Sequence, residues 1–285
     1  LPDSVMFNLL IGTEALAARI GSPDLVVCDV RHDLMRADAW GEAQYAAGHV
    51  PGALFVHLDR DLSAAKTGRN GRHPLPTPEA AAAVFSRLGI TDGKQVVAYD
   101  QGGGMFAARL WWMLRWLGFE SVAVLDGGFA KWTAEGRPVS TEPGVPVPAA
   151  FRIAHVTPTV SATGIMNSIP RHALVIVDAR APERFRGESE PMDPVAGHIP
   201  GARNRPASQN LNADGTFKDP AFLRAEFAAV LGEDSPDLVV HSCGSGVTAC
   251  HNALAMEIAG MPGTRLYPGS WSEWCADPER PVAVG

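Results

Sequence analysis

The sequence predicts an α/β protein of two homologous domains, each built on a mostly parallel central sheet flanked by helices. Three observations predict this fold class. Several short motifs occur twice in the same order, between 142 and 149 residues apart. Short runs of β-branched apolar residues alternate with helical stretches in each half. The length of 285 residues suits two domains.

The repeated motifs extend over nearly the whole chain. Asp29-Val30-Arg31 recurs 149 residues later as Asp178-Ala179-Arg180. The same distance separates Gly48-His49-Val50-Pro51-Gly52-Ala53 from Gly197-His198-Ile199-Pro200-Gly201-Ala202. The later pairs are Gly127 with Gly269, Trp132 with Trp274, and Arg137-Pro138-Val139 with Arg280-Pro281-Val282. Matches in the same order at nearly constant distances indicate that one domain has been duplicated.

Prolines mark the boundary between the two copies. Pro143, Pro146, Pro148 and Pro158 interrupt any regular element, because proline fixes φ and lacks a backbone donor. We therefore expect a first domain over residues 1–140, an extended linker over 141–159 and a second domain over 160–285.

Within each half, short valine- and isoleucine-rich runs fit buried parallel strands, and the longer stretches between them fit helices. In the first half we expect helix 13–20, strand 25–30, helix 78–88, strand 96–99, helix 106–117 and strand 122–125. In the second half we expect strand 174–178, helix 221–230, strand 238–241 and helix 248–259. Gly118 and Gly260 stand where a left-handed residue would end the two equivalent helices.

Composition excludes several classes of protein. The net charge of −7 and the pI near 5.7 argue against general binding to nucleic acid or acidic membranes. No apolar run reaches eighteen residues, so no membrane-spanning helix is expected. Four cysteines are too few for a disulfide scaffold, and Leu1-Pro2-Asp3-Ser4 does not resemble a signal peptide. We therefore expect reduced thiols in a cytoplasmic protein.

The two copies differ at the end of one strand, where open α/β sheets place their ligands. The first copy has Asp100 there, and the second has Cys243 followed by Gly244-Ser245-Gly246-Val247-Thr248. We call residues 243–248 the Cys243 loop. Its glycines bring backbone N–H groups together at a helix N-terminus, which favours a thiolate or a persulfide anion. The loop indicates an activated nucleophile, and the alternative is a buried structural cysteine.

The remaining cysteines fit ordinary packing, because an unpaired cysteine behaves as a small hydrophobic residue. These are Cys28, Cys250 and Cys275. A zinc site from His241, Cys243, Cys250 and His251 is disfavoured, since no Cys-x-x-Cys pair occurs and the four residues straddle a strand and two helical turns. No metal site is expected.

With these motifs in view, the chain resembles the tandem-domain rhodanese superfamily. It is most similar to 3-mercaptopyruvate sulfurtransferases and the related bacterial thiosulfate sulfurtransferases. The resemblance implies that the first domain, with Asp100 at the cysteine position, is inactive. It also implies a ping-pong reaction in which a Cys243 persulfide forms and passes its sulfur to cyanide, a thiol or a thioredoxin-like protein. No metal or organic cofactor is implied.

The resemblance also implies residues that bind the anionic sulfur donor. Arg184 in Arg184-Phe185-Arg186-Gly187 matches the donor-binding arginine, with Arg186 a weaker candidate and a surface salt bridge the alternative for Arg184. Mercaptopyruvate enzymes of animal type carry a second arginine nine residues on, where this chain has Asp193. Thiosulfate enzymes of animal type have basic residues just after the cysteine, where this chain has Ser245. The preferred donor, mercaptopyruvate or thiosulfate, stays open.

A proton-handling set follows from the same resemblance. Mercaptopyruvate enzymes combine a loop serine with an aspartate and a histidine, which Ser245, Asp59 and His73 match. Such a relay suits an enolate leaving group that needs a proton. The alternative for His73 is a surface position without a catalytic task. We expect His49 and His198, which occur in both copies, to be structural, and Trp40, Trp271 and Trp274 to be core residues.

Two other functions are possible on this fold. Dual-specificity phosphatases need an arginine six residues after the cysteine, where this chain has Ala249, and their loop is one residue longer. A non-catalytic binding module is the second alternative, and the cysteine at position 243 argues against it.

Overall fold

The computed structural model describes residues 6–36 and 38–285. Leu1 to Ser4, on which the expectation about a signal peptide rests, lie outside the described residues. The chain divides into two compact units. The first contains the described residues up to Leu62, Pro76–Thr157 and Ala213–Phe217, and the second contains Ser63–Leu75, Pro158–Asn212 and Lys218–Gly285. Two segments thus belong to a different unit from their sequence neighbours, which the expected boundaries 1–140 and 160–285 do not anticipate.

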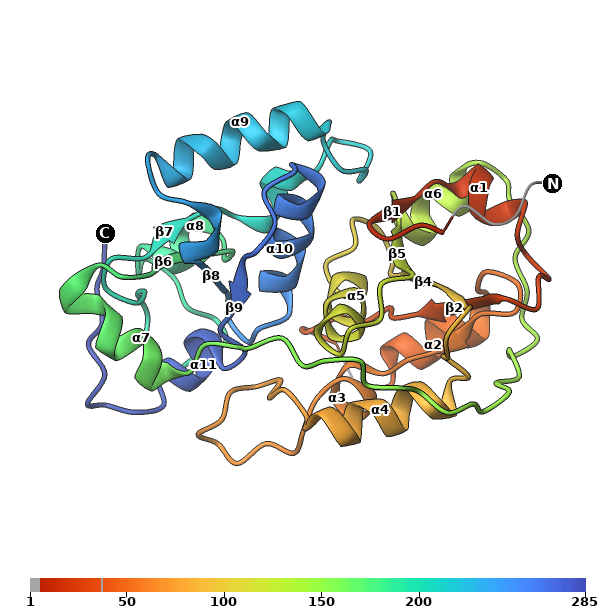
Figure 1. The fold of residues 1–285 in the computed structure, drawn as a ribbon, viewed down its shortest axis with the longest axis horizontal. Coiled ribbons are helices and arrows are strands. Elements are labelled where there is room, and N and C mark those ends of the chain that lie inside the picture. Colours follow the sequence, from red (N-terminus) through yellow and green to blue (C-terminus); the bar gives the residue numbers. More distant parts are fainter. Residues whose placement is uncertain (1–5, 37) are drawn as a thin grey trace. The chain divides into compact units, whose positions relative to one another are not determined.

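The first unit holds a five-stranded parallel sheet (Figure 1). Its strands lie in the order β1 (Leu10–Ile11), β5 (Val122–Leu125), β4 (Gln95–Tyr99), β2 (Leu25–Asp29) and β3 (Leu54–Phe55). The second unit repeats the last four positions in the order β9 (Arg265–Leu266), β8 (Val239–Ser242), β6 (Val175–Asp178) and β7 (Arg203–Asn204), again all parallel. The predicted fold class is confirmed.

Helices flank both sheets, as the strand and helix alternation predicts. Those of the first unit are α1 (Thr13–Ala17), α2 (Trp40–Ala47), α3 (Leu58–Asp61), α4 (Pro78–Arg87), α5 (Ala107–Trp116) and α6 (Gly128–Ala134). Those of the second are α7 (Ala162–Ser168), α8 (Pro182–Phe185), α9 (Pro220–Leu231), α10 (Thr248–Ile258) and α11 (Ser270–Trp274). Short 3-10 turns occupy Ile169–Arg171, Ala207–Asn210 and Pro236–Leu238. Gly118 and Gly260 follow α5 and α10 with φ of 83° and 68°, as expected for residues that end a helix.

The central strands of both sheets are buried along their whole length, so both faces of each sheet are covered. Strand alternation puts one core cluster of each unit on one of these faces. In the first unit Val27, Val97 and Tyr99 point to the face on which Leu16 of α1 and Trp132 of α6 pack. In the second unit the corresponding face is covered by α7 and α11. Its core residues are Ile165, Ile176, Val240, Tyr267, Trp271 and Trp274. The last two are almost completely buried, as expected for core residues, whereas Trp40 is half-buried.

The repeated Asp-x-Arg motif connects each sheet to the repeated Gly-His turn. Asp29 accepts hydrogen bonds from the Arg31 guanidinium at 2.6–3.0 Å, and Arg31 Nη2 donates to the Gly48 carbonyl at 2.6 Å. In the second unit Arg180 bonds Asp178 and the Gly197 carbonyl in the same way. These buried pairs fix the turn against the strand end.

The repeated histidines have matching structural contacts. His49 stacks on Tyr45 with ring centroids 3.9 Å apart, and its Nδ1 lies 2.7 Å from the Tyr45 carbonyl oxygen. His198 stacks on Phe185 at 3.8 Å, with Nδ1 2.7 Å from the Phe185 carbonyl oxygen. These contacts support the structural role that we expected for both histidines.

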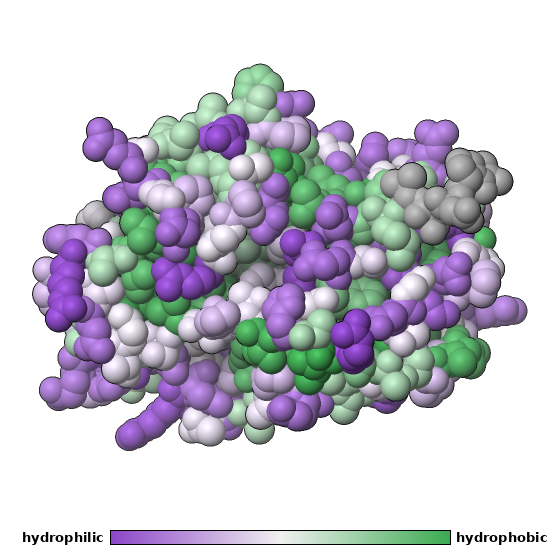
Figure 2. Space-filling model, in the orientation of Figure 1, coloured by the Kyte–Doolittle hydropathy of each residue, from purple (hydrophilic) through white to green (hydrophobic). Residues whose placement is uncertain are grey.

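The prolines of residues 141–157 hold the chain in an extended path along the first unit. The amides of Ala149, Ala154 and Thr157 donate to the carbonyls of Ser86, Leu117 and Trp116. On the face shown in Figure 2, hydrophilic side chains alternate with hydrophobic patches. Among the described residues, no helix has the length and apolar character needed to cross a bilayer.

Candidate active site

Cys243 directly follows β8, at the carboxyl end of the second sheet. Its Sγ accepts hydrogen bonds from the backbone N–H groups of Gly246 and Ser245, at 3.1 and 3.4 Å. The Cys243 amide donates to Ser270 Oγ at 3.0 Å, and its carbonyl accepts from the Trp271 amide at 2.9 Å. Backbone donors therefore surround the sulfur, and α11 fixes the backbone that carries it.

Gly246 makes the tight turn of the Cys243 loop possible. Its φ is 80°, and a Cβ at this position would lie 2.2 Å from the Pro268 carbonyl oxygen. Only glycine fits both constraints. The chain then enters α10 at Thr248, so the positive end of the helix dipole follows the loop directly.

His73 lies beside the Cys243 loop. Its Nδ1 is 2.7 Å from Ser245 Oγ, and both side chains are buried. His73 belongs to the segment Ser63–Leu75, which the contacts assign to the second unit. Within the second unit, His73 and Ser245 thus form one pair of the expected proton-handling set.

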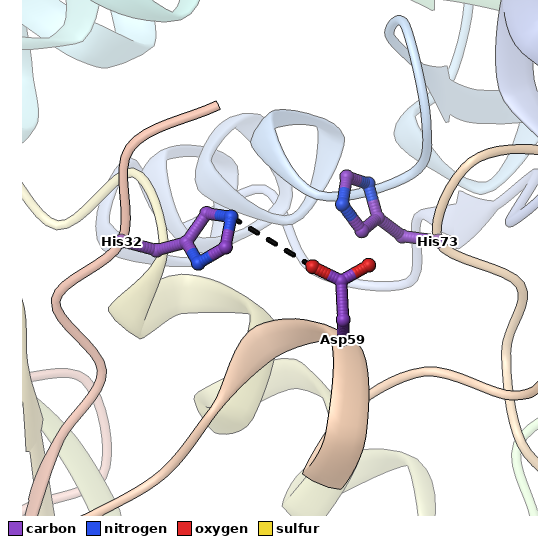
Figure 3. A group of neighbouring side chains, drawn as sticks. All are labelled: His32, Asp59 and His73. Carbon is purple, nitrogen blue, oxygen red and sulfur yellow. Dashed lines mark ion pairs between the residues drawn. The ribbon is translucent and has the colours of Figure 1, made fainter. Parts of the chain in front are cut away.

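Asp59, the third expected member, lies on α3 in the first unit. Its Oδ2 is 3.9 Å from Nε2 of His32, the pair marked by the dashed line in Figure 3. Burial lowers the pKa of His32, and the nearby carboxylate of Asp59 only partly opposes this effect. That Asp59 acts on His73 stays a prediction.

Two guanidinium groups lie against Gly244. Arg72 Nη2 is 2.7 Å from the point that a Gly244 Cβ would occupy, and Arg184 Nη2 and Nη1 are 3.5 and 3.6 Å from it. Arg184, on α8, is the donor-binding residue that the resemblance implies. Arg72, from the same segment as His73, was not expected there. A side chain at position 244 would occupy the space that the guanidinium of Arg72 takes.

Buried acids hold these arginines. Glu190 accepts from Arg184 Nε and Nη2 at 3.2 and 2.7 Å. Asp193 pairs with Arg72 Nη1 and, at 3.4 Å, with Arg184 Nη2. Burial alone would raise the pKa of Glu190, but hydrogen bonds from Arg184 and the Met192 and Asp193 amides bring it below its usual value. Arg184 thus forms salt bridges, which was the alternative to a role in donor binding, and its guanidinium also lies beside Gly244 of the Cys243 loop.

Arg186 points elsewhere. Its guanidinium pairs with Glu188 at 2.7 and 2.9 Å, and 44% of its side chain is exposed. Of the two arginines in Arg184-Phe185-Arg186-Gly187, the structure brings only Arg184 to the Cys243 loop.

In the first unit, Asp100 occupies the position of Cys243. Its two carboxylate oxygens accept hydrogen bonds from four backbone N–H groups, those of Gly102, Gly104, Phe106 and Ala107, at 2.8–3.1 Å. The loop before α5 therefore also gathers donors around one negative group. It is two residues longer than the Cys243 loop, because Ala107 begins α5 seven residues after Asp100 and Thr248 begins α10 five residues after Cys243.

The other three cysteines differ from Cys243 in their surroundings. Burial, helped by the charge of Asp29, raises the pKa of Cys28 to about 12. Burial and the charge of Asp193 raise the pKa of Cys275 to about 11. Cys250 Sγ donates to the Gly246 carbonyl at 3.4 Å. The groups of side chains that could hold one ion, among the described residues, include none of the zinc ligands considered above.

Ser270 is a site residue that the sequence reasoning missed. It has φ of 53° and accepts the Cys243 N–H at 3.0 Å while its own hydroxyl donates to the Tyr267 carbonyl. Its equivalent in the first copy, 142 residues earlier, is Gly128, whose φ is 59°. Alignment of the two copies at this position would have shown a serine where the backbone favours glycine.

The rhodanese-like domain family matches residues 13–135 and 162–277. A Pseudomonas aeruginosa protein named "Probable 3-mercaptopyruvate sulfurtransferase" is 46% identical over 279 residues, covering 97% of this chain and 98% of that protein. The thiosulfate sulfurtransferase of Cricetulus griseus is 36% identical over 296 residues, covering 99% of this chain and 97% of that one.

Among solved structures, the 3-mercaptopyruvate sulfurtransferase SseA of Escherichia coli superposes with a TM-score of 0.80 at 33% identity, covering 93% of this chain and 99% of SseA. Sequence and structure agree over both units, so the family match spans the duplication rather than one copy. The chain belongs to the rhodanese family and is a sulfurtransferase with two rhodanese-like domains in tandem.

Proposed function

We propose that this sulfurtransferase takes sulfur from 3-mercaptopyruvate, with thiosulfate as a second donor, through a persulfide on Cys243. The observation that carries this proposal is the 2.7 Å contact of His73 with Ser245, in the same loop as a thiol that receives two backbone N–H groups. The loop stabilises sulfur anions, and the serine–histidine pair can move a proton.

In the first half-reaction, the Cys243 thiolate attacks the sulfur of mercaptopyruvate. The new S–S bond forms as the C–S bond breaks, and the electron pair of that bond leaves with the pyruvate enolate. Ser245 Oγ–H donates a proton to the enolate carbon. His73 returns a proton to the serine, and this proton is the one that the thiol of mercaptopyruvate gives up, so the persulfide is left as an anion. The products are pyruvate and the Cys243 persulfide.

The Cys243 loop stabilises the charged persulfide. The inner sulfur already accepts from Ser245 and Gly246. In this proposal the outer sulfur extends toward the N-terminus of α10, where the helix dipole favours a negative charge. In the second half-reaction cyanide, a small thiol or a thioredoxin-like protein attacks the outer sulfur, and the Cys243 thiolate leaves unchanged.

The donor preference follows from the leaving group. Thiosulfate releases sulfite, which is stable as an anion and needs no proton on carbon. Mercaptopyruvate releases an enolate that becomes pyruvate only when its carbon is protonated. A serine–histidine pair next to the nucleophile therefore favours mercaptopyruvate. We propose Arg184 as a residue that binds the anionic end of either donor, and Asp59 as a further member of the proton-handling set.

The first domain, in this proposal, has no sulfur chemistry, because Asp100 has no thiol and already occupies the donors of its loop. The partners are small anionic donors and thiol or cyanide acceptors, and the net charge of −7 gives no reason to include nucleic acid. We further propose a reducing, cytoplasmic compartment, which suits four free thiols.

Intact-mass measurement tests the proposal. The protein is mixed with a small excess of mercaptopyruvate or thiosulfate in the absence of an acceptor. We expect a gain of about 32 Da, one sulfur atom, in the wild type and in Cys250→Ser, and none in Cys243→Ser. A binding module without catalytic activity would show no gain in any of the three proteins, and this outcome would refute the proposal.

A further inference from the structure

Contacts on both sides of Arg72 in the sequence hold this residue in place. Its backbone N–H donates to Ser272 Oγ at 3.0 Å. The preceding Gly71 packs so closely on Gly269 that a Cβ there would lie 2.9 Å from the Gly269 carbonyl oxygen. The following His73 contacts Ser245 at 2.7 Å. The guanidinium of Arg72 is therefore held at the residue after the nucleophile by its own neighbours.

The side chains of the two arginines are more exposed than those of the acids that they pair with. Side-chain exposure is 22% for Arg72 and 17% for Arg184, but only 4% for Asp193 and for Glu190. The carboxylates are almost completely buried, and the guanidinium side chains keep part of their surface exposed. An anion bound beside Gly244 would therefore lie next to two guanidinium groups.

Part of each guanidinium stays available. Arg72 uses Nη1 for Asp193, and its buried Nε has no hydrogen-bond partner among the described residues. Arg184 uses Nε and Nη2 for Glu190 and Asp193, which leaves its Nη1 edge out of these bonds. A guanidinium has five N–H donors, and buried donors in folded proteins are almost always paired. The buried Nε of Arg72, which has no partner among the described residues, marks this guanidinium as a position for an acceptor that comes from a ligand.

We propose that Arg72 is a second donor-binding residue, and that Arg72 and Arg184 together bind the carboxylate and the adjacent ketone oxygen of mercaptopyruvate. This inference rests on the proposed function of Cys243. In this proposal Arg72 takes the place of the second arginine that animal-type relatives carry nine residues after the first. This chain has Asp193 at that position, and the acid holds Arg72 in place instead.

The test measures the rate of Cys243 persulfide formation against mercaptopyruvate concentration, by rapid quenching and intact mass. The variant is Arg72→Met, and the control is Arg69→Met, which removes the same charge from an exposed position three residues earlier. We expect Arg72→Met to raise the donor concentration for half-maximal rate about 10- to 100-fold, the worth of charge-assisted hydrogen bonds. We expect Arg69→Met to change it less than about twofold.

A second measurement separates anion binding from a general disturbance of the segment. Iodoacetate and iodoacetamide alkylate the same thiol, but only iodoacetate is an anion. In Arg72→Met we expect the alkylation rate of Cys243 to fall about tenfold or more for iodoacetate and to stay within about twofold for iodoacetamide. Equal loss with both reagents would indicate a structural role and overturn the inference.

The two proposals fail in different ways. If the wild type gains no sulfur, the proposed function fails. If the wild type gains sulfur and Arg72→Met has the same concentration dependence and reagent ratio, only the role of Arg72 fails.

Discussion

Nδ1 of His73 lies 2.7 Å from Oγ of Ser245, although 172 positions separate the two residues in the sequence. The contact joins the segment Ser63–Leu75 to the Cys243 loop of the second domain. Through this contact the hydroxyl of Ser245 has a partner that can accept and return a proton. Backbone N–H groups alone cannot do so.

Ser245→Ala should affect the two donors differently. We expect persulfide formation from mercaptopyruvate to slow about 10²- to 10⁴-fold, the usual contribution of a positioned proton donor. With thiosulfate we expect a loss below about tenfold, because sulfite needs no proton on carbon. Single-turnover rates with both donors provide the measurement, with the exposed Ser208→Ala as control. Equal losses with the two donors would argue against a proton relay.

Ser270 should matter for stability as well as for the nucleophile. Ser270→Ala leaves the buried Cys243 N–H without its partner and should reduce the free energy of unfolding by about 1–3 kcal/mol. Ser270→Gly loses the same hydrogen bond but suits φ of 53°, so it should be more stable than Ser270→Ala by about 1 kcal/mol. Urea unfolding of the three proteins tests this order, and a glycine variant less stable than the alanine variant would contradict it.

The carboxylate of Asp100 should stabilise the first domain. Asp100→Asn replaces one of two oxygens that accept backbone N–H groups with an NH₂ group, which places donors against donors. We expect a loss of about 2–4 kcal/mol in urea unfolding. Asp92→Asn removes the same charge from an exposed pair with Arg152 and should cost less than about 0.5 kcal/mol. Similar losses of stability in the two variants would show that the hydrogen bonds from the four N–H groups do not need the negative charge of Asp100.

His241 should make stability depend on pH. Its side chain is completely buried, neither ring nitrogen has a hydrogen-bond partner among the described residues, and burial lowers its pKa to about 3. In the unfolded chain the imidazole takes up a proton below about 6.5, which the folded protein cannot do. The free energy of unfolding should therefore fall by about 1.4 kcal/mol per pH unit as the pH drops from 6.5 toward 3.

His241→Leu removes this dependence and keeps the site filled. Between pH 7.5 and pH 5.5 the wild type should lose about 1.4 kcal/mol more than the variant in urea unfolding. The control is His155→Gln, which changes an exposed histidine. If His241→Leu loses as much stability as the wild type over this range, the buried imidazole is not the cause.

The sequence predicts the duplication and the sheets because these depend on local pattern. The Val and Ile runs before Asp29 and Asp178 form β2 and β6, and the paired motifs extend over both domains. The comparison of Asp100 with Cys243 directs attention to one loop, since the two copies have the same backbone position and different chemistry.

The rest depends on contacts between distant parts of the chain. Arg72 reaches Gly244 because its amide bonds Ser272, 200 positions away, and no local pattern encodes that pairing. The helices α3 and α8 are four residues long, so tertiary packing rather than helix propensity determines them. Arg186 is the opposite case. The sequence motif makes it a candidate for donor binding, but its side chain lies at the surface and pairs with Glu188.

The four hydrogen bonds to Asp100 also mean that the backbone donors of the loop in the first domain are already paired with a negative group. Its loop binds an anion that belongs to its own chain, so no solute can add to that stabilisation. In the proposed reaction the sulfur held by the Cys243 loop changes its charge and size, and we expect only the second domain to gain stability when the persulfide forms. Sulfur occupancy should therefore be detectable as a change in the melting of one half of the molecule, with the other half as its internal reference.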